Sequence, residues 1–468
     1  MDFSIAEIAE AVKGEIYNNT DKNIRIKNIA TDSRGIFPDS LFFAIKGEKF
    51  DGHDFILNAF KNGALGVVAR KSWVKQFALP DEAATIVAVD DTVQALLDFS
   101  KRYKQSCKGL ILTVAVTGSV GKTTVKEFVY SVLSEKFKTK KTVGNLNTEI
   151  GLPYTLFSLE KDTEAVVLEM GMSGFGEIKR LSEAANPDTA VINNIGTSHI
   201  EMLGSREGIK KAKFEILDGM DLNSNIILNA DEPLLYCEKN KTGRKEYFFG
   251  IDNKEADFIA ENIEFDYIEN ISVFEADKCK YKIPAAGIHN VSNALPALIA
   301  GKIYGLSDGE IQEGFNNFEN VKMRQNIYRF HDITLIDDCY NASEESVLAA
   351  FNVLAGIAAQ KKANGNTRKI AVLSDILESG GYSNQIHSNI GDAAVNKNID
   401  IVYLFGEKSK ATYETIKRHD KIECVYFDDK SEIAQVLYNR AKKGDVILFK
   451  ASRGMALETV IEEFKNKY

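Results

Sequence analysis

Short apolar runs alternate with helical patterns along most of the chain, and this alternation predicts the fold. Apolar positions recur at helical spacing between these runs, for example at Val125, Phe128 and Val132 and again over 91–102. The runs themselves, rich in β-branched and aliphatic residues, lie at 41–45, 66–69, 111–116, 165–168, 189–192, 225–228, 333–336, 370–373, 401–405 and 446–449. Strands that alternate with helices form mostly parallel sheets, so we predict an α/β protein.

The length of the chain and the grouping of its apolar runs predict three domains. A chain of 468 residues exceeds the size at which a single core stops growing. We expect a small N-terminal α/β domain over 1–105, a central domain with a mostly parallel sheet over 106–318, and a C-terminal Rossmann-like domain over 319–468. Ligands bind at the carboxyl ends of parallel strands, so the polar residues that follow the strands are the candidates for chemistry.

A glycine-bracketed lysine follows the 111–116 run. Residues 117–126 read TGSVGKTTVK and lie between an expected strand and an expected helix, where unpaired N–H groups and the helix dipole favour anions. Lys122 can reach the terminal phosphates, and the Thr123 hydroxyl can bind Mg²⁺. Val116 stands where the usual motif has glycine, so this is a shortened form. The predicted nucleotide-binding residues of the loop are Gly118, Ser119, Gly121, Lys122, Thr123 and Thr124.

Two further strand ends carry groups that could face this loop. Glu169 directly follows the 165–168 run, and His199 follows the 189–192 run within INNIGTSHIE. Glu169 is a hard oxygen donor suited to Mg²⁺, and His199 could hold a second ion. From spacing alone, both side chains could equally be ordinary hydrogen-bonding groups.

Three other polar clusters have ordinary structural explanations. The lysines of KKAKFE at 210–215 have the pattern of a solvated helix face. Asn290 and Asn293 lie one turn apart at the start of an expected helix. The DDCYN segment at 337–341 ends a strand. Capping and turn chemistry would account for the last two clusters.

Composition narrows the class of protein. Hydrophobic residues make up 44% and charged residues 27%, which is typical of a globular protein, and a net charge of −9 gives no reason to expect nucleic acid as a partner. The five cysteines lack the paired spacing of a disulfide framework or zinc site. The acidic, amphipathic N-terminus does not resemble a secretory signal, and no apolar run approaches the roughly 20 residues of a membrane span. We expect a cytoplasmic protein without membrane insertion.

Taken together, the chain's motifs resemble the ATP-dependent Mur ligases of peptidoglycan synthesis over essentially its full length. Within that family the likeness is strongest to the ligases that add D-alanyl-D-alanine to UDP-N-acetylmuramoyl-tripeptide. The order and co-occurrence of the motifs are far more specific than any one of them. They are DSR at 32–34, DGHDFI at 51–56, the phosphate loop, GNLNTEIGLP at 144–153, LEMGMSGFGEI at 168–178, NIGTSHIEMLGSREGIKKAKFEI at 194–216, GIHNVSNALPA at 287–297 and DDCYNAS at 337–343.

The resemblance implies a role for each matching residue. Ser33 and Arg34 would meet the uridine end of the substrate, and further substrate-binding residues would be Asn145, Asn147 and Thr148. In the metal site, Thr123 and Glu169 would hold one Mg²⁺ and His199 a second. Lys213 would carry a carbamate, which turns its cation into an anionic oxygen ligand for the metal and reverses its interpretation as a solvated lysine. The remaining nucleotide contacts would come from Asn290, Asn293, Arg324 and Asp338.

The implied reaction is ATP-dependent amide bond formation through an acyl phosphate, giving ADP and phosphate. Paired Mg²⁺ and Lys122 would offset the repulsion between the attacking carboxylate and the γ-phosphate. Because Arg324 and Asp338 come from the third domain, we expect hinge closure on substrate binding. We also expect a monomer. The chain departs from the family pattern at Glu344, Ser374 and Ala451, in the domain where the dipeptide should bind.

Other functions compete with this interpretation. The nearest is another ligase of the superfamily with a different acceptor. One that adds the third amino acid to the muramoyl peptide would usually show a DNPR-like segment in the last domain, which this chain lacks, and DSR and DGHDFI argue against a folylpolyglutamate synthetase-like enzyme. A non-catalytic nucleotide-binding relative is opposed by the joint presence of Lys122, Thr123, Glu169, His199 and Lys213. A kinase or motor with a phosphate loop would place an aspartate, not Glu169, after the neighbouring strand.

Overall fold

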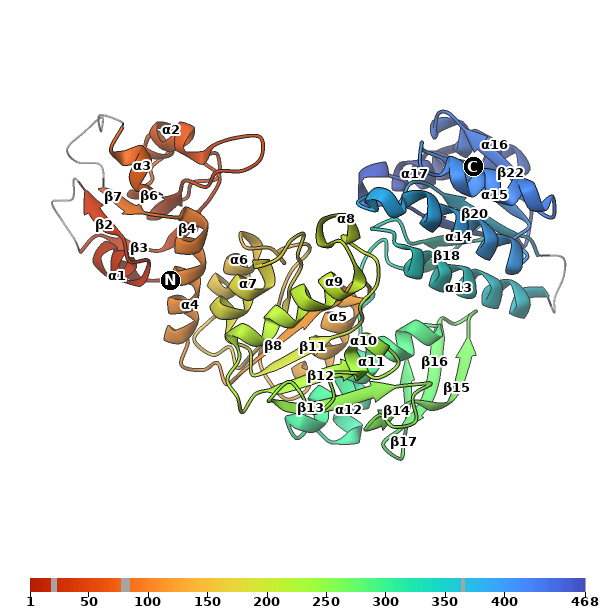
Figure 1. Ribbon diagram of the computed structural model, residues 1–468, viewed down its shortest axis with the longest axis horizontal. Helices are drawn as coiled ribbons and strands as arrows, with labels where there is room; N and C mark the ends of the chain where they lie inside the picture. The colour runs from red at the N-terminus through yellow and green to blue at the C-terminus, as the bar shows by residue number, and fades with distance from the viewer. Residues whose placement is uncertain (18–22, 77–84, 363–366, 468) are drawn as a thin grey trace.

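Three α/β units follow one another along the molecule (Figure 1). The computed structural model describes residues 1–17, 23–76, 85–362 and 367–467. The N-terminal unit, in red and orange, and the C-terminal unit, in blue, lie at opposite ends of the long axis with the central unit between them. The predicted fold class is confirmed. None of the helices in the described ranges is both long and apolar enough to span a bilayer.

The N-terminal unit is built on a five-stranded sheet. Its strands run in the order β2 (Glu15–Tyr17), β7 (Thr85–Val89), β6 (Gly66–Arg70), β5 (Ser40–Phe43) and β4 (Asn28–Ala30). All neighbours are parallel except β2 and β7, and β1 (Phe3–Ser4) pairs separately with β3 (Arg25–Ile26). The helices are α1 (Ile5–Ala11), α2 (Ile56–Lys61), α3 (Lys71–Val74) and α4 (Thr92–Ser106).

Helix α4 joins the N-terminal unit to the central unit. Asp91 caps it by accepting hydrogen bonds from the N–H groups of Val93 and Gln94. The helix was expected to end near residue 102, but it continues to Ser106. Tyr103 explains the extension, because its ring is buried and its hydroxyl donates to the Leu159 carbonyl at 2.8 Å.

The central unit carries a seven-stranded, fully parallel sheet. The strand order is β14 (Phe258–Ile259), β13 (Lys245–Gly250), β12 (Asn225–Asn229), β11 (Thr189–Ile192), β8 (Leu112–Thr117), β10 (Ala165–Glu169) and β9 (Thr139–Lys141). Its helices are α5 (Lys122–Ser134), α6 (Gly151–Phe157), α7 (Glu177–Ala185), α8 (Ile200–Leu203), α9 (Arg206–Phe214), α10 (Pro233–Tyr236), α11 (Ile288–Ile303) and α12 (Asp308–Asn316). Because β8 is flanked by β11 and β10, the ends of all three strands meet at one edge.

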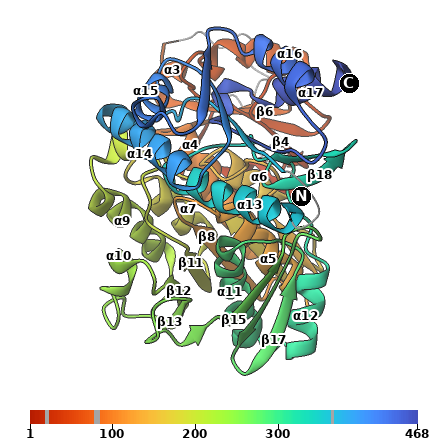
Figure 2. The same cartoon turned by 90° about the vertical axis from the view of Figure 1, so that its right-hand side faces the viewer.

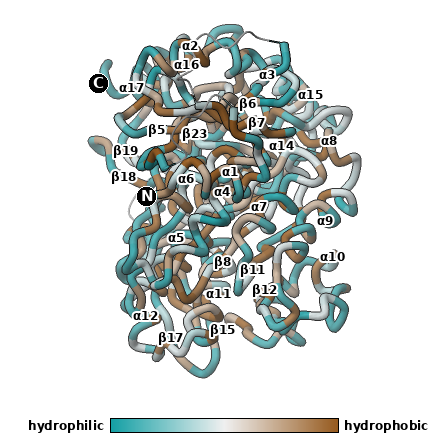
Figure 3. The backbone as a smooth tube through the Cα atoms, turned by 90° about the vertical axis from the view of Figure 1, so that its left-hand side faces the viewer, coloured by the Kyte–Doolittle hydropathy of each residue, from teal (hydrophilic) through white to brown (hydrophobic). Residues whose placement is uncertain are grey.

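Alternation along β8 separates the two faces of this sheet. Val114 and Val116 pack with α5, α11 and α12, whereas Ala115 packs on the opposite side with α4, α6, α7 and α9. Both faces are covered by helices, so the inner strands are hydrophobic, and in Figure 3 they are largely brown while the outlying loops are largely teal. Burial on both faces accounts for the continuous apolar runs in the sequence.

A small antiparallel sheet, absent from the sequence-based prediction, extends from the central unit. It consists of β15 (Glu261–Asp266), β16 (Ile271–Ala276) and β17 (Cys279–Ile283). The turn between β15 and β16 points toward the C-terminal unit (Figure 1).

The C-terminal unit has a six-stranded sheet between two helical layers. The strand order is β18 (Asn326–Phe330), β19 (Ile333–Asp337), β23 (Val446–Lys450), β20 (Lys369–Leu373), β21 (Ile401–Phe405) and β22 (Glu423–Phe427), with only β18 antiparallel. Helices α13 (Glu344–Lys362), α14 (Ser383–Asn396) and α15 (Lys410–His419) contribute to one core cluster, and α16 (Ser431–Arg440) and α17 (Glu458–Lys467) to the other. Helix α13 is on the side of this unit that faces the central unit (Figure 2).

Candidate active site

The loop between β8 and α5 has the geometry of an anion cradle. Gly121 caps α5 at φ 81°, a conformation that L side chains rarely adopt. A Cβ atom there would lie 2.5 Å from Asn293 Oδ1 and 2.8 Å from Asn193 Nδ2, so both backbone shape and space require glycine. The first turn of α5 leaves the N–H groups of Lys122, Thr123 and Thr124 directed out of the helix end, where a phosphate can accept them.

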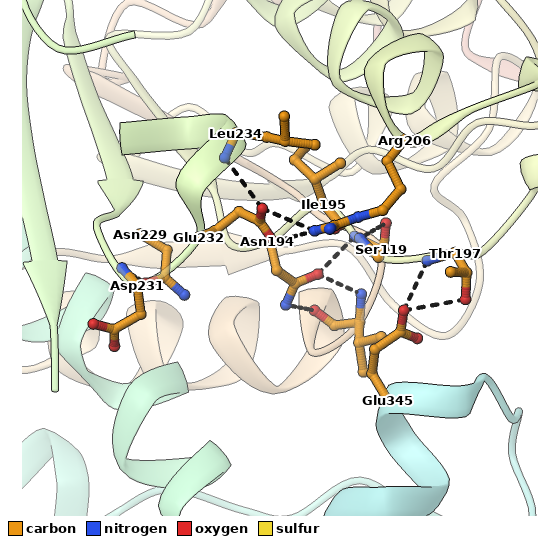
Figure 4. Close-up of polar contacts among 12 residues, drawn as sticks. Ser119, Asn194, Ile195, Thr197, Arg206, Asn229, Asp231, Glu232, Leu234 and Glu345 are labelled. Carbon is orange, nitrogen blue, oxygen red and sulfur yellow. Dashed lines mark hydrogen bonds and ion pairs between the residues drawn. The ribbon is translucent and has the colours of Figure 1, made fainter. Parts of the chain in front are cut away.

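Asn194, which the sequence did not single out, fixes the first half of the loop. Its side-chain oxygen accepts from the N–H groups of Ser119 at 3.0 Å and Val120 at 2.8 Å, and its amide donates to the Val120 carbonyl at 2.9 Å. The Ser119 hydroxyl in turn accepts from the Gly196 N–H at 2.9 Å. These contacts, drawn in Figure 4, tie the phosphate loop to the segment after β11.

Thr123 and Glu169 are held together at the adjoining strand ends. The Thr123 hydroxyl donates to Glu169 Oε2 at 2.8 Å, and Asn147 Nδ2 donates to Glu169 Oε1 at 2.7 Å. The Glu169 backbone N–H donates to the Thr142 hydroxyl at 3.0 Å. A buried carboxylate next to a threonine hydroxyl offers two hard oxygen donors at the phosphate loop.

Two lysines lie beside this pair, Lys122 partly exposed and Lys213 buried. Lys122 Nζ donates to the carbonyls of Gly118 at 2.8 Å and Ser119 at 3.3 Å. Desolvation lowers the pKa of Lys122, repulsion from Arg324 acts in the same direction, and Glu169 opposes both. Lys213 is 2% exposed, and burial followed by repulsion from Lys122 lowers its pKa well below the usual value. The solvated-face interpretation of Lys213 is therefore wrong, although its neighbour Lys211 is exposed.

A cavity of about 270 Å³ lies over the phosphate loop and is lined by residues of the central and C-terminal units. Asn290 and Asn293 of α11 are buried in its wall. Arg324 and Asp338, from the third predicted domain, line the other side, and the Arg324 guanidinium lies 4.3 Å from the centre of the Tyr340 ring. The structure thus brings these four predicted nucleotide contacts together with the phosphate loop.

Gln325 links the two sides of the cavity and was also missed in the sequence. Its side-chain oxygen lies 2.6 Å from His289 Nε2, and its amide donates to the Ala286 carbonyl at 2.7 Å. Its backbone N–H donates to Asp338 Oδ1 at 3.1 Å, while Lys450 Nζ donates to the other Asp338 oxygen at 2.6 Å. Asp338 is thereby held in place from both sides.

His199 does not line this cavity. It adopts φ 63° before α8 and borders a second, smaller cavity of about 140 Å³ between the central and C-terminal units. His199 Nδ1 lies 2.7 Å from Glu378 Oε2, and the hydrogen bond with His199 lowers the pKa of Glu378. Its role as a ligand of a second ion stays a prediction. In the described ranges, no three His, Cys, Asp or Glu side chains converge as a metal-binding group.

The loop that carries His199 is held from two directions (Figure 4). Arg206 donates to the Ile195 carbonyl at 2.6 Å and pairs with Glu232 at 2.7 Å. On the other side, Glu345 at the start of α13 accepts from the Thr197 N–H at 2.9 Å and the Thr197 hydroxyl at 3.1 Å. The C-terminal unit therefore contacts this loop through Glu345 and Glu378.

The five predicted substrate-binding residues fall in different places. Buried Ser33 accepts from Asn58 and its carbonyl accepts from Asn62, while exposed Arg34 pairs with Asp32 in the N-terminal unit. Asn145 and Thr148 are exposed between β9 and α6. Asn147, by contrast, belongs to the Thr123–Glu169 group at the phosphate loop.

Three departures from the family pattern, at Glu344, Ser374 and Ala451, lie outside the second cavity, while Ile376 and Ser379 of the departing 373–380 segment line it. Ser374 is buried and donates to the Phe405 carbonyl at 2.6 Å, and Ala451 is fully buried in the core. Glu344 accepts from Asn389 at 2.8 Å, and burial raises its pKa. None of the three side chains lines the second cavity.

Fold and site together define a class: a multidomain α/β enzyme that binds a nucleotide triphosphate at a phosphate loop closed over by a second α/β unit. Comparison with family models then matches the Mur ligase family catalytic domain at residues 25–104, the Mur ligase middle domain at 116–301 and the Mur ligase glutamate ligase domain at 323–453. A Bacillus subtilis relative named UDP-N-acetylmuramoyl-tripeptide–D-alanyl-D-alanine ligase is 36% identical over 98% of each chain. The chain belongs to the Mur ligase family.

Two solved structures have the same architecture. A crystal structure of MurF from Acinetobacter baumannii has a TM-score of 0.89 at 28% identity, covering 100% of this chain and 99% of that one. The MurF ligase of Thermotoga maritima in complex with ADP has a TM-score of 0.81 at 29% identity, with coverage of 94% and 97%. The resemblance seen in the motifs is thus confirmed at the level of family and fold.

Proposed function

We propose that the protein joins D-alanyl-D-alanine to UDP-N-acetylmuramoyl-tripeptide in an ATP-dependent reaction of peptidoglycan precursor synthesis. The observation that carries the proposal is the cavity in which the phosphate loop, with Thr123 hydrogen-bonded to buried Glu169, faces Arg324 and Asp338 of the C-terminal unit. The name of the 36% identical relative supports this choice of substrates. The match covers 98% of each chain.

The residues present fit ATP with Mg²⁺. A hydroxyl and a carboxylate at 2.8 Å, Thr123 and Glu169, form the kind of small oxygen donor set that Mg²⁺ uses together with phosphate oxygens and water. Asn147 fixes the carboxylate in place. When bound, Mg²⁺ supplies positive charge that offsets the charge of the phosphates. His199 is the proposed ligand for a second ion once Glu378 no longer pairs with it.

The reaction divides into two transfers. The tripeptide carboxylate attacks the γ-phosphorus of ATP, the bond to the bridging oxygen breaks, and an acyl phosphate and ADP form. The dipeptide amine then attacks the acyl carbon, phosphate leaves, and the nitrogen loses its proton. Lys122 and the N–H groups at the start of α5 bind the phosphates, and Arg324 adds a cation from the opposite wall.

The second cavity is the proposed place of the incoming dipeptide. It borders His199 and is lined by Arg453 together with the hydroxyls of Ser343 and Ser452. Arg453 offers a cation for the dipeptide carboxylate, and Ile376 and Ile386 offer apolar contacts for its methyl groups. Glu344, Ser374 and Ala451 lie elsewhere, whereas Ile376 and Ser379, in the 373–380 segment that departs from the family pattern, belong to this lining.

Lys213 is the proposed site of a carbamate. Because burial lowers its pKa, more of its amine is neutral and able to add to CO₂ with loss of a proton. The product is an anion, which removes the repulsion from Lys122. ¹³C NMR with ¹³C-bicarbonate should show a carbamate signal that Lys213→Ala abolishes and the control Lys211→Ala retains; a signal that persists in Lys213→Ala would exclude this assignment.

The remaining assignments are also proposals. Ser33 and Arg34 would meet the uridine end of the substrate, and Asn145 and Thr148 would line the path from there to the phosphate loop. The domain limits at 105 and 318 are likewise proposed; α4 ends at Ser106 and α12 at Asn316. We propose a monomeric cytoplasmic enzyme.

Phosphate release tests the proposed function. The assay contains ATP, Mg²⁺, UDP-N-acetylmuramoyl-tripeptide and D-alanyl-D-alanine, and each is omitted in turn. Release that requires all four is expected. Release only with free amino acids as acceptors would make it a different ligase of the superfamily, and no release with any acceptor would favour a non-catalytic relative.

A further inference from the structure

The turn between β15 and β16 makes a specific contact with the C-terminal unit. Gln360, near the end of α13, accepts with its side-chain oxygen from the backbone N–H groups of Tyr267 at 2.8 Å and Ile268 at 3.2 Å. Its amide donates to the Phe265 carbonyl at 2.9 Å. A single side chain therefore satisfies three backbone groups, one near the end of β15 and two in the turn that follows it.

Gly356, one turn earlier in α13, makes room for the Tyr267 ring. A Cβ atom at Gly356 would lie 2.4 Å, 2.5 Å and 2.7 Å from the Cε2, Cζ and Cδ2 atoms of that ring. The ring packs against the core cluster of the C-terminal unit, although it belongs to the central unit. Glycine inside a helix is less stable than alanine, so the close approach of this ring supplies a reason for its presence.

The two elements that meet here also form walls of the nucleotide cavity. At its other end, α13 contributes Glu345, Ser346 and Ala350 to the lining. Glu345 and Gly356 are eleven positions apart, which corresponds to about 16 Å along a helix. On the side of the turn, Asn270 lines the cavity and its side-chain oxygen accepts from the Ala286 N–H at 2.9 Å, just before α11. Figures 1 and 2 both place α13 beside this small sheet.

We propose that Tyr267, Gly356 and Gln360 form a pivot that positions the C-terminal wall of the nucleotide cavity relative to the phosphate loop. They are positioning residues, because they reach the cavity only through α13 and Asn270. A displacement at Gly356 is carried along the rigid helix to Glu345. The proposal rests on nucleotide binding and does not depend on which acceptor the ligase uses.

Gly356→Ala is the sharpest perturbation. Alanine usually stabilises a helix relative to glycine, whereas here we expect it to disturb the packing. Gly309→Ala is the matched control: Gly309 lies in α12, is exposed, and has only one neighbouring atom within 4 Å, at 4.0 Å. Alanine at Gly309 should leave the protein unchanged or more stable. Alanine at Gly356 should displace the Tyr267 ring, and the double variant Tyr267→Leu/Gly356→Ala should relieve the collision.

The readouts are the affinity for a fluorescent ADP analogue with Mg²⁺, the radius of gyration in solution scattering, and thermal unfolding. For Gly356→Ala we expect affinity at least about tenfold weaker and a larger radius, since the walls separate, with recovery to within about threefold in the double variant. Gln360→Ala should weaken binding in the same direction without any collision.

Three results would overturn the pivot. The first is a Gly356→Ala variant that behaves like Gly309→Ala, and the second is a double variant that recovers nothing. The third is normal ADP affinity in Gln360→Ala. If Gly356→Ala does not fold, Gln360→Ala alone decides. A protein that binds ADP normally but forms no amide bond would contradict the proposed function and leave this test valid.

Discussion

Acid should weaken the C-terminal unit through one buried histidine, His387. It is 1% exposed, its Nε2 accepts from the Ile376 N–H at 3.2 Å, and its Nδ1 lies 3.1 Å from the Thr412 hydroxyl. The Thr412 hydroxyl donates its proton to the His387 carbonyl, so it can only accept from Nδ1. Nδ1 therefore carries the ring proton, and Nε2 is the unprotonated nitrogen that accepts from Ile376. Protonation of Nε2 would destroy the bond to Ile376.

The magnitude follows from the pKa. Burial lowers the pKa of His387 from 6.5 to about 4, with Lys408 adding to the effect and Asp375 opposing it. Below pH 6.5 the unfolded chain binds a proton that the folded chain refuses, so stability falls with pH until about pH 4. A difference of about 2.5 units corresponds to about 3 kcal/mol, fully present above pH 6.5 and lost by pH 4.

The assay uses ¹³C-labelled histidine, because the chain has only six. The NMR signal that disappears in His387→Gln should show no titration step near pH 6.5. Denaturant unfolding of His387→Gln, whose amide can still accept from Ile376 but does not titrate, should depend less on acid than unfolding of the exposed control His419→Gln. A His387 midpoint near 6.5, or equal acid dependence in the two variants, would refute the reasoning.

Three further predictions concern the site. Lys122→Ala should lower kcat by at least about 10²–10³-fold while thermal unfolding stays near that of the unsubstituted protein, since the lysine acts on phosphates; near-normal phosphate release would remove that role. Asn194→Ala leaves two loop N–H groups without their acceptor, so the free energy of unfolding should fall by about 1–3 kcal/mol and calorimetry should show weaker ADP binding. An unchanged free energy of unfolding together with unchanged ADP affinity would contradict this. Arg453→Ala should raise KM for D-alanyl-D-alanine but not KM for ATP. The control Glu458→Gln, which removes only the ion-pair partner of Arg453, should leave both KM values unchanged. Equal increases in both KM values in Arg453→Ala would place Arg453 outside the acceptor site.

Local patterns in the sequence were sufficient for much of the fold and for the phosphate loop. The parallel strands are buried on both faces and therefore appear as unbroken apolar runs. Gly121, Lys122 and Thr123 act through backbone geometry and neighbouring atoms, so a short motif identifies them. Asn290 and Asn293 share a helix face, and their spacing sufficed to group them.

The small antiparallel sheet escaped prediction because its strands face water on one side. Buried and accessible positions alternate along β16, and β15 is mostly exposed, so neither strand forms a continuous apolar run. Alternation over 261–266 and 279–283, with Asn270 and Asp277 at the turns, was the signal that could have found it.

Long-range polar partners were missed for a different reason. Asn194 acts on a loop more than seventy residues earlier, and Gln325 joins residues on both sides of the cavity. No local pattern distinguishes such side chains from ordinary polar loop residues. Lys213 shows the converse, since charge pattern alone predicted a solvated residue and only the resemblance to the family indicated otherwise.

The contacts between the central and C-terminal units differ in kind, and this difference suggests how the hinge closure expected from the sequence can occur. At the turn between β15 and β16, a ring and an amide are locked in place by packing and by three hydrogen bonds. Elsewhere, the carboxylates of Glu345, at the start of α13, and Glu378, which follows β20, contact the loop that carries His199. A triphosphate bound at the phosphate loop repels carboxylates but leaves the Tyr267 contact untouched. Substrate binding should therefore exchange the carboxylate contacts while the pivot holds, so that the C-terminal unit rotates about Tyr267 without separating from the central unit.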